Sequence, residues 1–182
     1  LYGLSPESIA KRLIDPELES WSEFDAYSET LLQVALNVPV QYPRGWVPTD
    51  VARPVKPLED AVRRLRFAVV FDGTPLRKPT IFKASERHIL DLFEHNGVHS
   101  SARGYFYAQR LNLKPHDLNG LLIRIRHAAV GEYDHTFWEF PPDEASLFQT
   151  WTSAEIWADD RLEDALNIDR RTFRVTHPAF VE

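Results

Sequence analysis

Residues 162–173 read LEDALNIDRRTF, and this stretch near the C-terminus decides the fold that we predict for the chain. It follows an apolar run from Phe148 to Ala158, predicted to be a β-strand, and Asp159-Asp160 separates the two. Within it, an acidic turn precedes a short apolar patch, after which come Asn167 and Arg170. An asparagine and an arginine on a loop between a strand and a helix are polar donors on a rigid support. Because the planar guanidinium fork suits phosphate oxygens, the stretch indicates an anion-facing loop.

The stretch resembles the catalytic loop in the middle domain of the heat-shock protein 90 family, which reads roughly LPLN-x-SRE. Three residues match this pattern and three differ from it: Leu166, Asn167 and Arg170 match, whereas Ala165, Asp169 and Arg171 replace Pro, Ser and Glu. Residues 153–173 are also similar to a bacterial branch of heat-shock-protein-90-like ATP-binding proteins. There SGEIY precedes a short spacer and GLEDALNIDR-x-SF, and Ala154 and Arg161 replace two of its glycines here.

The resemblance implies part of an ATPase of the gyrase–histidine kinase–MutL superfamily. In that family the loop arginine reaches the terminal phosphate of ATP, which a separate N-terminal domain holds. By analogy, Arg170 is the candidate catalytic residue, Asn167 and Arg170 are the candidate nucleotide contacts, and Mg-ATP is bound mainly outside this segment. The implied partners are the N-terminal ATP-binding domain, a client or partner protein, and a second copy in a homodimer of the full-length protein. The loop would also relay the nucleotide state.

The residues alone leave plainer interpretations open. An isolated arginine such as Arg170 is usually a surface or salt-bridged residue. Asparagine often braces a loop through the backbone, and for Asn167 this role is compatible with a phosphate contact. We expect Asp169 to accept hydrogen bonds inside the loop. The alternative function is a non-catalytic interaction module of the same fold. Its binding candidates are the five tryptophans, although core packing explains them as well: Trp21, Trp46, Trp138, Trp151 and Trp157.

Composition limits the class of protein. The net charge of −6 argues against a general nucleic-acid binder, and the absence of cysteine excludes a disulfide framework or thiolate metal site. No apolar run approaches the roughly 20 residues that span a bilayer. We therefore expect a cytoplasmic protein without a membrane or nucleic-acid partner. The chain begins at Leu1 and has no methionine, so we interpret it as a segment of a longer protein. Without a glycine-rich phosphate motif, it should not bind ATP well or be active by itself.

We predict two parts, a helical arm with a proline-rich connector over residues 1–57 and a core over residues 58–182. Capping and periodicity indicate helices over Leu4–Ile14 and Trp21–Asn37, the second capped by Ser22. Five prolines between Val38 and Leu58 indicate an irregular, extended connector.

The core is predicted to be α+β, a two-layer sandwich with a mixed or antiparallel sheet. The resemblance implies the ribosomal-protein-like middle, or transducer, domain. The expected elements are helical turns over 58–65, a strand over 67–71 with a hairpin partner at 78–82, a helix over 85–94, strands over 104–113, 121–130 and 148–158, a loop over 133–144, and a helical turn over 161–166. The core candidates of the 85–94 helix are Ile89, Leu90, Leu92 and Phe93.

Two further clusters are interpreted as structural. Arg124, Arg126 and His127 lie on a predicted strand, where a solvated sheet face is favoured over a binding surface. His95 and His99 are separated by an Asn-Gly pair that interrupts the helix needed to align them. A metal site needs three or four converging ligands, so we predict no metal site.

Overall fold

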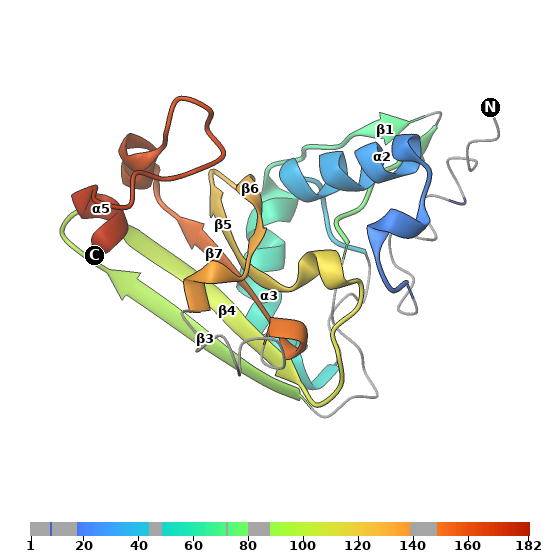
Figure 1. Cartoon of the computed structure of the whole chain (residues 1–182), viewed down its shortest axis with the longest axis horizontal. Helices are drawn as coiled ribbons and strands as arrows, with labels where there is room; N and C mark the ends of the chain where they lie inside the picture. The colour runs from blue at the N-terminus through green and yellow to red at the C-terminus, as the bar shows by residue number, and fades with distance from the viewer. Residues whose placement is uncertain (1–7, 9–17, 44–48, 72, 80–87, 139–148) are drawn as a thin grey trace. The chain divides into compact units, whose positions relative to one another are not determined.

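The computed structural model describes residues 8, 18–43, 49–71, 73–79, 88–138 and 149–182, with the side chains of 49–55 and 138 left out of the description. The chain divides into two compact units. The first holds Leu1–Glu86 and Leu113–Leu118, and the second holds Arg87–Asn112 and Asn119–Glu182. Figure 1 shows the elements in chain order. No helix in the described ranges is long and apolar enough to cross a membrane.

The first unit contains the short helix η1 (Trp21–Glu23), the helices α2 (Ala26–Asn37) and α3 (Thr49–Arg64), and the strands β1 (Val70–Phe71) and β2 (Thr74–Pro75). Asp25, rather than the predicted Ser22, caps α2 by accepting the backbone N–H groups of Tyr27 and Ser28 at 3.0 Å each. The helix η2 (His116–Leu118) is tied to η1 through Asp117, which accepts the Trp21 N–H at 2.7 Å. The predicted helix over 4–14 lies outside the described residues, apart from Ser8.

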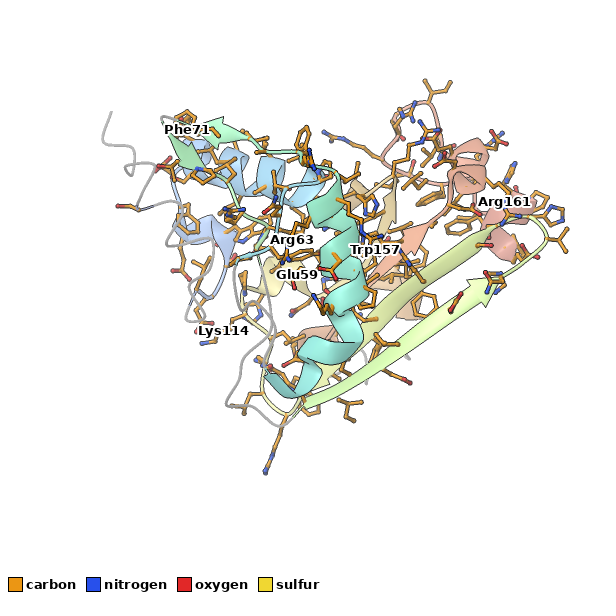
Figure 2. The ribbon with its side chains drawn as sticks, turned by 180° about the vertical axis from the view of Figure 1, so that it is seen from behind. Glu59, Arg63, Phe71, Lys114, Trp157 and Arg161 are labelled. Carbon is orange, nitrogen blue, oxygen red and sulfur yellow. The ribbon has the colours of Figure 1, made fainter. Side chains whose placement is uncertain are left out.

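The helix α3 corrects the prediction of an irregular connector over 49–58, whereas residues 38–43 are irregular as predicted and 44–48 lie outside the described residues. Each of the two internal prolines of α3 removes a backbone donor and crowds the preceding turn. Leu58 and Val62 are buried one turn apart, and the i,i+4 pairs Lys56–Asp60 and Glu59–Arg63 line its exposed side. Figure 2 shows Glu59 and Arg63 beside each other on this helix. Apolar burial and charge spacing therefore outweigh the local effect of proline, and α3 crosses the boundary expected between residues 57 and 58.

The small hairpin of the first unit is tighter than predicted. β1 is confined to Val70–Phe71 and pairs with β2; residues 80–82 of the predicted partner segment 78–82 lie outside the described residues. The register pairs Phe71 with Thr74, so the turn between them is very short. Gly73 adopts φ +82° there, a conformation that favours glycine.

The second unit is built on a five-stranded mixed sheet. The strands are β3 (His88–Asn96), β4 (Ser101–Gln109), β5 (Gly120–Ile125), β6 (Ala128–Asp134) and β7 (Thr152–Ala158), in the order β3-β4-β7-β5-β6. β5 and β7 run parallel, and the other neighbours are antiparallel. The short helices η3 (Thr136–Trp138), η4 (Asp160–Ala165) and α5 (Pro178–Val181) complete this unit. The α+β class with a mixed sheet is confirmed, as is the helical turn at η4.

Alternation along the strands gives the sheet two different faces. One face carries an apolar cluster that includes Ile123, Ile125 and Ala154, together with Leu162 of η4 and Ala179 of α5. The opposite face carries large and polar side chains that are nevertheless buried: Tyr105, Tyr107, Arg124, Glu155 and Trp157. The apolar face therefore anchors η4 and α5, the two elements on either side of the loop that holds Arg170.

The prediction of a helix over 85–94 is wrong, because most of this stretch is β3. Its nine residues pair in unbroken register with β4, from His88 opposite Gln109 to Asn96 opposite Ser101. A short apolar run fits a helix or a strand equally well, and the long-range pairing decides between them. None of the four expected core residues is buried, and Ile89 is 67% exposed.

The predicted strand over 121–130 is a hairpin, and Arg124 is not solvated. Arg126 and His127 form the turn between β5 and β6, with φ of +52° and +67°. Two consecutive positive φ values are the geometry of a type I′ turn, which usually carries Asn or Gly, so an Arg-His pair does not predict it. The Arg124 side chain is fully buried, with its Nε 2.6 Å from Glu155 Oε2. The other predicted strands shift by a few residues, and β6 extends into the expected loop to Asp134.

Candidate functional site

The arginine loop, residues 166–173, is held by its own backbone. Leu166 and Phe173 form an isolated antiparallel bridge at its base. The Asn167 N–H donates to the Thr172 carbonyl at 2.9 Å, and the Asn167 carbonyl accepts the Arg170 N–H at 2.9 Å. The side chain of Asn167 adds a bond from Nδ2 to Thr172 Oγ1 at 2.9 Å. Asn167 therefore braces the loop, and its assignment as a nucleotide contact stays a prediction.

Asp169 is the second brace, as predicted. Its Oδ1 accepts the backbone N–H of Arg171 at 2.9 Å and that of Thr172 at 3.2 Å, and its Oδ2 accepts the Thr172 hydroxyl at 3.1 Å. The bond from the Arg171 N–H is the main cause that holds the pKa of this carboxyl below its ordinary value. The ionised form of Asp169 is thus the form that organises the apex of the loop.

Arg170 stands at that apex. Its φ of +56° lies in the left-handed region, which is uncommon for a residue with a side chain and costs free energy unless the surroundings impose it. The side chain is 70% exposed, and it faces Glu163, with Nη2 3.5 Å from Oε1. The bonds of Asn167 and Asp169 thus hold the backbone in a strained conformation that presents an exposed guanidinium.

A second arginine approaches the same carboxylate from the β5–β6 turn. Arg126 Nη2 lies 3.3 Å from Glu163 Oε2, and Arg126 Nε lies 3.1 Å from Asp160 Oδ1. The hydrogen bond and charge of Asp160, followed by the charge of Glu163, raise the pKa of Arg126. Glu163 therefore joins Arg126 to Arg170 although they are far apart in sequence. On the continuous strand predicted over 121–130, Arg126 has no reason to lie next to Glu163, so this contact was not predicted.

Gly131 of β6 sets the position of the loop, a role that was not predicted from the sequence. It has φ +69°, and a Cβ at this position would lie 2.6 Å from the carbonyl oxygen of Arg171. No real Cβ contact is that short. The bare glycine thus lets β6 approach the loop backbone next to Arg170, and a glycine within a strand is the sequence signal that marks such an approach.

We expect Gly131→Ala to displace the arginine loop. The left-handed backbone alone should cost roughly 1–2 kcal/mol, and the clash with the Arg171 carbonyl should add to it. NMR should show shifted amide signals for residues 170–173. A denaturation curve should show a lower midpoint of unfolding. Gly73→Ala is the matched control, because Gly73 has φ +82° with nothing within 4 Å of the added Cβ. Unchanged loop signals in Gly131→Ala would show that the close approach does not position the loop.

Acid should loosen the loop through Asp169. Its folded-state pKa lies below the ordinary value of 3.8, so its contribution to stability is complete above that value and is lost as pH falls through the lower folded pKa. In an NMR titration, we expect the amide signals of Arg171 and Thr172 to move only below pH 3.8. Asp169→Asn should abolish that movement while keeping one acceptor oxygen. A transition above 3.8 would contradict the assigned hydrogen bonds.

A pocket of about 320 Å³ lies near this loop, at one end of the sheet. Its lining includes Arg103, Arg126 and Trp157, but also the acidic Glu94 and Asp160, and neither Asn167 nor Arg170 contributes to it. Acidic side chains disfavour a phosphate in this wall. The pocket therefore does not form a nucleotide cradle around Arg170.

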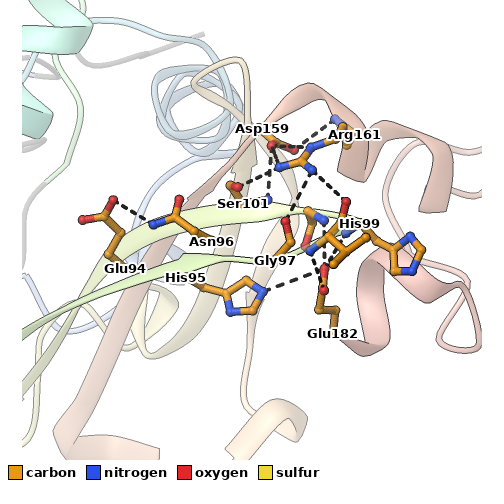
Figure 3. A network of polar contacts seen from close by, with 11 residues as sticks. Glu94, His95, Asn96, Gly97, His99, Ser101, Asp159, Arg161 and Glu182 are labelled. Atoms are coloured by element: carbon orange, nitrogen blue, oxygen red, sulfur yellow. Dashed lines mark hydrogen bonds and ion pairs between the residues drawn. The ribbon is translucent and has the colours of Figure 1, made fainter.

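The two histidines considered as metal ligands, His95 and His99, lie around the β3–β4 turn (Figure 3). The carboxylate of Glu182 holds the backbone of this turn. Glu182 accepts the backbone N–H groups of Val98, His99 and Ser100 at 2.7, 2.8 and 3.0 Å. His95 Nε2 is 3.9 Å from the same carboxylate. Within the described part of the chain, no group of three or more His, Cys, Asp or Glu side chains is arranged to hold a metal ion.

Comparisons with protein-family models, with curated proteins and with solved structures found no match to this chain. The resemblance of residues 153–173 to the heat-shock protein 90 loop therefore stays a prediction. What the site offers chemically is an exposed, permanently charged guanidinium on a braced loop, beside a second arginine that shares its counter-ion.

Proposed function

We propose that this chain is the middle-domain segment of a heat-shock-protein-90-like ATPase, which supplies Arg170 to the γ-phosphate of ATP bound by a separate N-terminal domain. The observation that carries the proposal is the state of Arg170. Its side chain is largely exposed at the apex of a self-braced loop, and its backbone is held at φ +56°. Backbone strain that the surroundings impose is frequent at functional sites, and this supports the proposal.

The chemistry of phosphoryl transfer fits this arrangement. In transfer to water, charge gathers on the equatorial oxygens of the γ-phosphate, and a positioned guanidinium stabilises it electrostatically. Because the loop is already braced, little ordering is required when a phosphate arrives. The 3.5 Å contact with Glu163 is a long one for a charged hydrogen bond, so a phosphate oxygen can compete for the same Nη2.

The donors around the loop also favour a composite site over a complete one. The backbone N–H groups of Arg170, Arg171 and Thr172 are already used by Asn167 and Asp169, so these three amides are not available to a phosphate. The Glu163 carboxylate lies 3.5 Å from Arg170 Nη2 and places negative charge beside the guanidinium. Most contacts to Mg-ATP must therefore come from the other domain, and Arg170 acts only when that domain brings the γ-phosphate to it.

We expect the chain by itself to show no binding of Mg-ATP tighter than about millimolar, because one exposed arginine contributes little affinity against water and salt. Isothermal titration calorimetry on the 182-residue chain measures this directly. Micromolar binding would contradict the composite site. The catalytic role itself is tested by turnover of Arg170→Ala against Arg171→Ala in the protein that joins this chain to its nucleotide-binding domain.

The second candidate function is a non-catalytic protein-interaction module of the same fold. The three tryptophans whose side chains are described do not favour it, since Trp21 and Trp157 are buried and Trp151 donates to Asn112 Oδ1 at 3.0 Å; Trp46 and the side chain of Trp138 lie outside the description. The observation in its favour is the exposed apolar edge strand β3. Normal turnover in Arg170→Ala would select this second function.

A further inference from the structure

β3 is an edge strand with apolar side chains exposed on both of its faces. Within the described residues it pairs only with β4, so from Ile89 to Asn96 its other edge has no strand partner among them. Ile89 and Phe93 point to one face and Leu92 to the other, with exposures of 67%, 37% and 45%. A single exposed apolar residue is ordinary, but three within five residues of one edge strand form a patch.

β3 carries two acidic residues, Asp91 and Glu94, but it lacks the other usual protections of an edge strand. It contains no proline or lysine, its register with β4 has no shift, and it is nine residues long. Soluble proteins normally shorten, bulge or charge such an edge, because it templates the addition of another strand. The other edge, β6, also has two acidic residues, Glu132 and Asp134, and in addition its register with β5 shifts and Gly131 lies within it. The difference indicates that the β3 edge is covered in the working protein.

The charged residues of β3 determine the register in which a second β3 strand can pair with its edge. In an antiparallel pair of two β3 strands, the same residues turn their free backbone groups outward in both copies, so the two-fold axis must pass through a residue. An axis through Asp91 or Glu94 places like charges opposite each other, and an axis through Leu92 places Asp91 opposite Phe93. An axis through Phe93 places Leu92 opposite Glu94, but it also places Phe93 opposite itself and gives each Asp91 carboxylate a His95 imidazole of the second copy as its partner.

We propose that two copies of this chain associate through an antiparallel β3–β3 pairing centred on Phe93, which joins the two sheets into one. Phe93 meets its counterpart at the axis, and the Asp91 carboxylate of each copy accepts a hydrogen bond from the His95 imidazole of the other. Aromatic pairs and hydrogen-bonded polar pairs directly across an antiparallel ladder are stabilising cross-strand pairs. The pairing is independent of the proposed ATPase role, because it uses no residue of the arginine loop.

Sedimentation velocity over a range of concentrations tests the association in the 182-residue chain. We expect a reversible monomer–dimer equilibrium. Asp91→Lys replaces the acceptor of the His95 imidazole by a donor at two symmetric positions, so it should weaken the dimer about tenfold or more. Adding His95→Glu to Asp91→Lys should restore association. Glu132→Lys is the control, because it makes the same charge change on the exposed surface of the opposite edge strand.

Cysteine cross-linking tests the register, and the chain contains no natural cysteine to interfere. Residues directly opposite each other lie about 4.5–5.5 Å apart, within reach of a disulfide, whereas diagonal neighbours lie about 7–8 Å apart. Under mild oxidation, Phe93→Cys should therefore give a covalent dimer and Leu92→Cys should not. A monomer at every concentration, or equal cross-linking at positions 92 and 93, would overturn the proposal.

Discussion

Arg170→Ala is expected to slow ATP hydrolysis at least about tenfold in the protein that joins this chain to its nucleotide-binding domain, which is roughly 1.4 kcal/mol of barrier. The substitution removes a charge-assisted donor whose contact strengthens as charge develops on the γ-phosphate. The affinity for ATP should change little, because the other domain makes most ground-state contacts. Single-turnover hydrolysis and nucleotide titration measure these two effects separately.

Two further substitutions make the Arg170 experiment specific. Arg170→Lys should recover only part of the rate, because an ammonium group cannot reproduce the planar fork of a guanidinium. Arg171→Ala is the matched control: it removes an exposed neighbouring charge and leaves the backbone contact of Arg171 with Gly131 intact. Equal losses at positions 170 and 171 would indicate a damaged loop. Normal turnover in Arg170→Ala would remove the catalytic role.

The parts of the site that sequence reasoning reached are those with local causes. Asp169 braces backbone groups two and three residues further along, and Asn167 pairs with Thr172. Short polar side chains form such contacts with their own neighbourhood whatever the rest of the fold does. The helical turn of η4 is local in the same way, since Asp159 caps it by accepting the Arg161 N–H at 3.1 Å.

What sequence reasoning missed depends on partners that are distant in the chain. The residues around Arg124 do not predict its ion pair with Glu155, which lies in the parallel neighbour strand β7. The pattern of residues 88–96 suits a helix until β4 offers nine pairing positions. A glycine is required at position 131 only because tertiary packing brings β6 close to the Arg171 carbonyl. In each case a long-range contact determines the conformation that a short-range pattern leaves open.

Glu155→Ala should have the largest effect on stability, a loss of about 3–5 kcal/mol in the free energy of unfolding. The Arg124 and Glu155 side chains are 0% and 3% exposed, and the carboxylate also accepts the hydroxyls of Tyr105 and Tyr133 at 3.2 and 2.9 Å. The substitution thus removes the carboxylate that neutralises a buried guanidinium and leaves two phenol donors without this acceptor. Urea denaturation followed by circular dichroism measures the loss.

The double substitution Arg124→Met/Glu155→Leu separates the cost of a broken pair from the worth of the intact pair. Replacing both buried charges by apolar side chains of similar size should recover most of the stability, because the desolvation penalty of each ion disappears with it. Asp160→Ala is the exposed counterpart: it breaks the surface pair with Arg126, which solvent already screens, so stability should stay nearly unchanged. If Glu155→Ala cost no more than Asp160→Ala, water would have to reach the ion pair, and the buried polar face of the sheet would need a different explanation.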